Sequence, residues 1–182
     1  MKRLAIAAVV GVFGLALLPV SASARLIGPA LPISHDYHWA TFDHGPGITS
    51  VASDMKAPFD GKITRVRLEA IEGNVKVQVI RRRNGRYTVI RESGWRGVNS
   101  VLHEVITLKT TLRVRKGNLV GLRLGTQDGA TEFGSHATGS NGPFTEQFDP
   151  ALVFGQRPRL PSLPPAFIYR WYQLLFNATI RH

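Results

Sequence analysis

The stretch Lys62-Ile63-Thr64-Arg65-Val66-Arg67-Leu68-Glu69-Ala70 alternates the apolar residues Val66, Leu68 and Ala70 with the charged residues Arg65, Arg67 and Glu69. After Glu72-Gly73-Asn74 a second alternation follows in Val75-Lys76-Val77-Gln78-Val79. Side chains two residues apart share a face of a β-strand, so each segment predicts a strand with one buried and one solvated face. Glu72-Gly73-Asn74 predicts a turn between the two strands. Asn84-Gly85 then predicts a tight hairpin that returns through Tyr87-Thr88-Val89-Ile90.

Further strands are predicted toward the C-terminus. They cover Val101 to Leu108, Leu112 to Val114 and Leu119 to Leu124, with turn-forming residues between them. Phe167 to Arg181 is rich in aromatic and β-branched residues and predicts one closing strand. Short strands at this regular spacing are typical of sandwiches and jelly rolls, so we expect an all-β fold: an antiparallel, jelly-roll-like β-sandwich.

The N-terminus has the three parts of a secretory signal peptide. Lys2 and Arg3 precede an apolar run from Leu4 to Val20, and the small residues Ala22-Ser23-Ala24 end it. Residues 1–24 are therefore predicted to be a signal peptide, and residues 25–182 a single β-sandwich domain that is secreted or held in the cell envelope. An uncleaved anchor is the alternative. The chain has no cysteine, so core packing alone must stabilise the exported domain.

Three segments resemble uncharacterised secreted bacterial β-sandwich domains. They are Ala57-Pro58-Phe59-Asp60-Gly61-Lys62-Ile63-Thr64-Arg65, Leu112-Arg113-Val114-Arg115-Lys116-Gly117-Asn118-Leu119-Val120-Gly121-Leu122 and Leu174-Leu175-Phe176-Asn177-Ala178-Thr179-Ile180. The resemblance implies a jelly-roll-like sandwich and brings no established activity with it. Asn118 stands where an Asp is usual, which argues against a calcium role at that turn.

Basic residues dominate the chain, with 23 Lys and Arg against 12 Asp and Glu. Four arginines concentrate at the expected hairpin tip: Arg81, Arg82, Arg83 and Arg86. Other cations fall on polar strand faces, and if those faces coincide a basic sheet results: Arg65, Arg67, Lys76, Arg113 and Arg115. Arginine binds phosphate and carboxylate with two parallel hydrogen bonds, so an anionic cell-envelope polymer is the expected partner. Nucleic acid is not expected because no nucleic-acid-binding motif is present. A merely solvated basic surface is the alternative.

An aromatic platform is predicted on the closing strand. Tyr169 and Trp171 fall on the face opposite Leu174 and Phe176, and Gln173 and Asn177 continue that face. Aromatic rings stack on sugar faces and amides bind hydroxyls, so this face predicts a glycan site. The alternative is that the proline-rich segment 160–165 covers both rings. Trp39 and Trp95 fit either a core or a site.

A histidine cluster lies near the start of the mature chain. His35, His38 and His44, with Asp36 or Asp43, provide donor atoms that suit zinc or another transition metal. On a strand His35 and His38 would point to opposite faces, so only a loop could bring them together, and no HExxH-type helix accompanies them. Solvated loop histidines are the alternative.

We therefore expect a non-catalytic module that binds an extracellular glycan or an anionic cell-envelope polysaccharide, without a cofactor and without a transmembrane segment after signal cleavage. A metal-dependent extracellular enzyme using His35, His38 and His44 is one alternative. A structural surface protein is the other.

Overall fold

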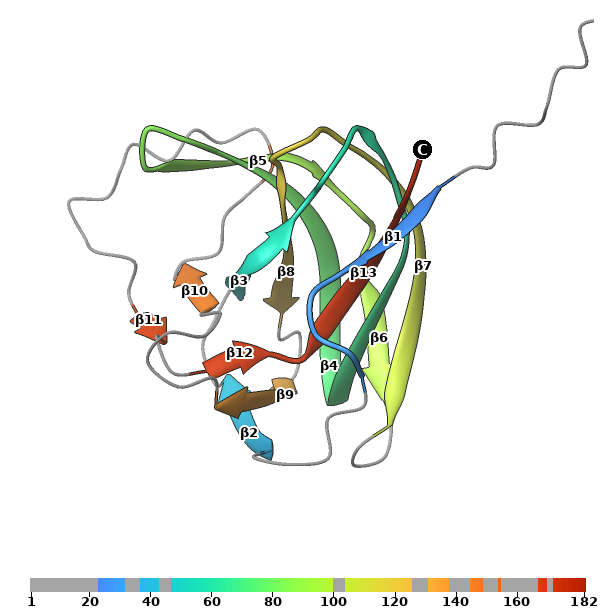
Figure 1. The fold of residues 1–182 in the computed structure, drawn as a ribbon. Coiled ribbons are helices and arrows are strands. Elements are labelled where there is room, and N and C mark those ends of the chain that lie inside the picture. Colours follow the sequence, from blue (N-terminus) through green and yellow to red (C-terminus); the bar gives the residue numbers. More distant parts are fainter. Residues whose placement is uncertain are drawn as a thin grey trace, which may run out of the picture.

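The computed structural model describes residues 23–31, 37–42, 47–99, 104–125, 131–137, 145–148, 154, 167–169 and 172–182; within β2, β9, β11 and β12 it describes the backbone only. The described residues form thirteen strands and no helix (Figure 1). The strands are β1 (Ala24–Ile27), β2 (Tyr37–Phe42), β3 (Ile48–Lys56), β4 (Gly61–Arg83), β5 (Arg86–Glu92), β6 (Arg96–Asn99), β7 (Val105–Val114), β8 (Leu119–Gly125), β9 (Thr131–Ala137), β10 (Thr145–Phe148), β11 (Phe167–Tyr169), β12 (Tyr172–Leu174) and β13 (Phe176–Arg181).

The long strand β4 belongs to two antiparallel sheets and joins them. Its first half, residues 61–69, pairs with β13 and β7, and β1 extends this sheet beyond β13; we call it sheet A. Its second half, residues 72–83, pairs with β5, β6 and β8, and the sheet continues through β3, β10 and β11; we call it sheet B. Strand β9 joins β4 between the halves and pairs with β2 and β12. Figure 1 shows β4 bending where it passes from one sheet to the other.

The core lies between the two sheets. Val66, Leu68 and Ile180 from sheet A pack in one apolar cluster with Val77 and Leu122 from sheet B, and all five are at most 2% exposed. Burying a valine, leucine or isoleucine side chain stabilises a fold by about 1.5–3 kcal/mol. The antiparallel β-sandwich predicted from the alternation is confirmed.

A second, smaller cluster lies on the opposite face of sheet B. It contains Val51, Ile80, Val89 and Leu119, with Tyr87 and Phe148 packed against it. Ile80 directly follows Val79, which faces the main core, and consecutive strand residues point to opposite faces. The outer face of sheet B is therefore partly apolar.

The Asn84-Gly85 hairpin is confirmed. Arg83 pairs with Arg86 across it, and both turn residues have positive φ, 50° for Asn84 and 72° for Gly85. Two positive φ values define the turn whose twist matches paired strands, and asparagine and glycine reach them at least cost.

Two of the segments that carry the family resemblance contact each other. The turn before β8 docks on the segment before β4: Lys116 N donates to Asp60 Oδ1 at 2.7 Å, and Gly117 N donates to Ala57 O at 2.8 Å. Asn118 Oδ1 accepts from Arg115 N at 2.9 Å, so the asparagine side chain holds its own turn. This contact fixes the start of β4 beside the start of β8.

Three sequence predictions about strand limits were wrong. Glu72-Gly73-Asn74 is a bend within β4 rather than a turn, because β6 pairs across it and Gly73 adopts a φ of 131°. The strands predicted at Val101 to Leu108 and Leu112 to Val114 are one strand, β7, because the whole of it pairs with β4; residues 101–103 lie outside the described residues. The closing segment forms β11, β12 and β13, which pair with β10, β9 and β4 respectively.

Candidate anion-binding surface

The outer face of sheet A carries a set of cationic side chains that we call the basic face. It consists of Lys62, Arg65 and Arg67 on β4, Lys109 and Arg113 on β7, and Arg181 on β13. Their strand neighbours Ile63, Val66 and Leu68 are buried in the core, so alternation directs these cations outward. All of them are exposed except Arg67, which is half-buried.

Strand register brings these cations side by side. Lys62 pairs with Arg113 on one side and with Arg181 on the other, and Arg65 pairs with Lys109. Directly opposed side chains lie about 4.5–5.5 Å apart at Cβ, so like charges there repel. None of the six forms an ion pair with another described residue. The basic sheet that the sequence predicted is confirmed for Arg65, Arg67 and Arg113. It is wrong for Lys76, which lies on sheet B, and for Arg115, which lies in the turn after β7.

Sequence reasoning missed three members of the basic face: Lys62, Lys109 and Arg181. Strict alternation counted back from Val66 would place Lys62 on the buried face, and the register shift between Ile63 and Arg65 turns it outward. The positions of Lys109 and Arg181 depend on which strands pair with β4 and in which register.

The four arginines of the predicted hairpin are exposed, but they do not share one face. Arg83 pairs with Arg86, and Arg81 lies two residues before Arg83, so these three point to one side. Arg82 points to the other side, where its guanidinium carbon lies 5.2 Å from the ring centroid of Tyr87. The hairpin therefore offers three guanidinium groups together rather than four.

Trp95 is an exposed aromatic side chain, 43% accessible, between β5 and β6. Lys76 Nζ lies 5.0 Å from its ring centroid and the guanidinium carbon of Arg123 lies 5.4 Å from it. Lys76 Nζ also lies 2.7 Å from Glu92 Oε1. Trp95 is therefore a surface aromatic set among cations, not a core residue.

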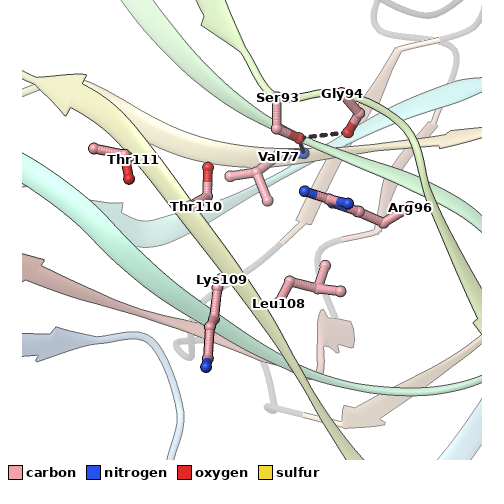
Figure 2. Close-up of a pocket in the computed structure, with 8 residues that line it drawn as sticks. All are labelled: Val77, Ser93, Gly94, Arg96, Leu108, Lys109, Thr110 and Thr111. Carbon is pink, nitrogen blue, oxygen red and sulfur yellow. Dashed lines mark hydrogen bonds between the residues drawn. The ribbon is translucent and has the colours of Figure 1, made fainter.

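A hollow of about 340 Å³ lies between β7 and the start of β6 (Figure 2). Its lining comes from β4, the link between β5 and β6, the first residue of β6, and β7: Val77, Ser93, Gly94, Arg96, Leu108, Lys109, Thr110 and Thr111. Figure 2 shows the guanidinium group of Arg96 directed toward Val77. The Ser93 hydroxyl accepts from Val77 N at 3.0 Å and donates to Gly94 O at 2.9 Å, which holds the link between β5 and β6 in place.

The predicted aromatic platform stays a prediction for three of its residues. Trp171 and the side chains of Tyr169 and Gln173 lie outside the described residues. Asn177 is on the face of β13 opposite Phe176, as the alternation predicted, but its side chain does not face solvent.

Asn177 is only 1% exposed, and its Nδ2 donates to Pro29 O at 2.9 Å. The segment that follows β1 contacts this amide and covers it. The solvent-facing position predicted for Asn177 is therefore wrong, because sequence alternation assigns a face of the strand but not what packs on that face.

Of the predicted metal ligands, His35, His44 and the side chain of His38 lie outside the described residues. The backbone of His38 belongs to β2 and pairs with Ser135. In the part of the chain that the structure describes, no group of three or more potential ligands is placed to hold a metal ion. In the described part of the chain, no helix is long and apolar enough to cross a membrane.

Comparison with known proteins assigns no family. No family model matches the chain, and no curated protein matches it. Among solved structures, the fold is similar to the crystal structure of the cysteine protease and lectin-like domains of Cwp84, a surface layer associated protein of Clostridium difficile. The match covers 82% of this chain and 36% of that chain, with 10% sequence identity and a TM-score of 0.40. A likeness at this level carries no functional argument.

Proposed function

We propose that this protein is a non-catalytic β-sandwich module that binds an anionic polysaccharide outside the cytoplasm through the basic face of sheet A. The observation that carries the proposal is the direct cross-strand pairing of Lys62 with both Arg113 and Arg181, and of Arg65 with Lys109. Opposed like charges lower the stability of the free protein, and a bound polyanion would neutralise them and relieve this repulsion.

Two further features support an anionic partner. Of the exposed acidic side chains of the described residues, Asp54 and Glu72 lie on strands of sheet B, and Asp60 and Glu104 lie just before β4 and β7. Arg81, Arg83 and Arg86 form a second exposed cationic group, which a long polymer can also contact. A repeating chain of carboxylates suits such spaced cations because each arginine binds one carboxylate with two hydrogen bonds.

The same proposal includes export. Residues 1–22 lie outside the described residues, and the expected cleavage point between Ala24 and Arg25 falls within β1, where Ala24 pairs with Arg181. Cleavage there leaves Arg25 to Ile27 paired with β13. N-terminal sequencing of the chain expressed with its own leader tests this step, and a mature chain beginning at Arg25 is expected.

The decisive experiment measures binding of the full chain to polygalacturonate, to neutral dextran and to DNA at about 0.05 M and about 0.5 M salt. We expect polygalacturonate binding that weakens strongly with salt, and no dextran binding. Arg65→Gln/Arg113→Gln should remove most of the binding. Arg91→Gln, an exposed arginine on β5, is the matched control and should change little.

Three outcomes contradict the proposal. Unchanged binding by the Arg65→Gln/Arg113→Gln variant excludes the basic face, and loss of binding only with Arg81→Gln/Arg83→Gln moves the site to the hairpin. Tighter binding of DNA than of polygalacturonate at matched charge excludes polysaccharide as the preferred partner.

A further inference from the structure

We infer that the hollow between β7 and the start of β6 is a subsite for one carboxylate-bearing sugar unit, with Arg96 binding its carboxylate. The inference rests on the proposed function and deepens it, because it assigns one sugar unit of the anionic polysaccharide to a defined hollow. The volume of about 340 Å³ lies at the small end of the range for ligand pockets and suits a single sugar ring rather than a longer segment.

The lining has the three kinds of group that an acidic sugar requires. Val77 and Leu108, 2% and 9% exposed, provide an apolar floor for the carbon–hydrogen face of a ring. The hydroxyl groups of Thr110 and Thr111 can bind ring hydroxyls. Arg96 forms no ion pair with another described residue, and none of the eight lining residues is acidic.

A bulge in β7 places two of these residues at the hollow. Ile63 pairs with Leu112 and Arg65 pairs with Lys109, so Thr110 and Thr111 together oppose the single residue Thr64. Such a bulge re-aims side chains locally, and bulges are frequent beside functional sites. Both threonines line the hollow.

The hollow is continuous with the basic face. Lys109 lines the hollow and also pairs with Arg65 on the outer side of sheet A. Figure 2 shows the ammonium group of Lys109 pointing away from Arg96, so a single small anion in the hollow meets chiefly the guanidinium. A polysaccharide lying across β4 and β7 can thus place one sugar unit in the hollow while its neighbours contact Lys109 and Arg65.

The chemistry favours a carboxylated sugar over inorganic phosphate. Phosphate sites commonly combine several cations or a series of backbone N–H groups, because the ligand carries more charge and has no apolar surface. In this hollow the guanidinium group of Arg96 points inward, and Val77 and Leu108 form an apolar floor. A planar carboxylate also matches the two parallel donors of a guanidinium group.

The test is an amide chemical-shift titration of the full chain with D-glucuronate, with D-glucose and with inorganic phosphate. We expect glucuronate to shift the amides of residues 93–97 and 108–111, and glucose and phosphate to bind at least about tenfold more weakly, since a charged hydrogen bond is lost in one case and the apolar contact in the other.

Two variants separate charge from shape. Arg96→Gln should weaken glucuronate binding at least about tenfold, and Arg96→Lys should restore part of it. Arg65→Gln/Arg113→Gln should leave the monosaccharide affinity unchanged while removing polymer binding. A thermal melt of each variant shows whether it is folded, so loss of binding without loss of fold is assigned to the site.

The outcomes distinguish this inference from the proposed function. Salt-sensitive binding of polygalacturonate with no glucuronate shifts at residues 93–97 and 108–111 overturns the subsite and leaves the basic face intact. Equal shifts with phosphate and glucuronate overturn the assignment to sugar. Glucuronate binding in the hollow without polymer binding supports the subsite and rejects the polymer function.

Discussion

Lys62 and Arg113 are direct cross-strand neighbours on the outer face of sheet A, and both side chains are exposed. Natural sheets often place opposite charges in such positions, because opposite charges attract and like charges repel. The same relationship recurs between Lys62 and Arg181 and between Arg65 and Lys109. The free protein thus maintains a repulsive surface, and this repulsion can be measured.

Removing one cation should stabilise the unbound protein. Lys62→Gln relieves repulsion with both Arg113 and Arg181, so it should raise the free energy of unfolding by about 0.2–1 kcal/mol at low salt. The gain should shrink at high salt, where the screening length falls to about 3 Å at 1 M. Urea unfolding at two salt concentrations checks this, with Arg91→Gln as the control. A gain independent of salt would assign the effect to strand propensity instead.

Glu92 should be essential to a small polar network on sheet B. Its carboxylate accepts from Lys76 Nζ at 2.7 Å and from Gln78 Nε2 at 3.2 Å, and Gln78 in turn accepts from Thr49 Oγ1 at 3.1 Å. Gln78 and Thr49 are fully buried. Glu92→Ala removes the acceptor for both donors and should cost about 1–3 kcal/mol of stability.

A double variant separates pairing from packing in this network. Lys76→Met/Glu92→Gln removes both charges while keeping most of the side-chain volume, so it should recover part of the stability lost in Glu92→Ala. Urea midpoints of both variants provide the measurement. A Glu92→Ala protein within about 0.5 kcal/mol of the original would show that the network contributes no more than an ordinary surface contact.

The position of Trp95 should depend on a glycine. A Cβ at Gly125 would clash with the ring atom Cη2 of Trp95, so Gly125→Ala should push the half-exposed indole outward from Lys76 and Arg123. We expect red-shifted tryptophan fluorescence and a loss of about 0.5–1 kcal/mol from the cation–π contacts.

Gly97→Ala is the matched control for this displacement, because among the described residues its Cβ would contact only Asn74 Oδ1, at 3.8 Å. The emission of Trp95 is isolated by subtracting the spectrum of Trp95→Phe. An unshifted spectrum in Gly125→Ala would mean that the backbone of β8, rather than the indole, gives way.

Local patterns predicted much of the fold. The alternation at Arg65, Val66 and Arg67 assigned strand faces correctly, and Asn84-Gly85 located the hairpin, because both depend only on neighbouring residues. The continuity of β4 through Gly73 was not predictable in this way. It depends on β6 and β8 pairing with the second half of the strand.

In the candidate site, too, local patterns predicted single residues but not the strand pairing that brings them together. Arg65, Arg67 and Arg113 were predicted on polar faces, yet their assembly into one surface requires the register of β7 and β13 against β4. The hollow is lined by residues of β4, β6 and β7 that are remote in sequence, so no local pattern signals it. Long-range register is set by the sum of core packing along each strand, so residues remote in sequence determine it.

Tyr87 should make stability depend on alkaline pH. Burial raises the pKa of its phenol, and the hydrogen bond that Tyr87 donates to the Glu146 carboxylate and the charge of that carboxylate raise it further, whereas Arg82 lowers it. The folded pKa thus lies above the unfolded value of about 10, so the folded state holds the proton more tightly.

This contribution of Tyr87 to stability is fully present below about pH 10 and is lost as the pH rises above it, because the unfolded chain then gains by releasing the proton. Tyr87→Phe should cost about 1–2 kcal/mol at neutral pH, since the Glu146 carboxylate loses a partly buried donor. Above about pH 10 the difference between Tyr87→Phe and the original protein should narrow. Urea unfolding at neutral pH and at several values from about pH 9 to 11 measures both effects. If the difference in the free energy of unfolding between Tyr87→Phe and the original protein stays constant across that range, the phenol ionises alike in the folded and unfolded states.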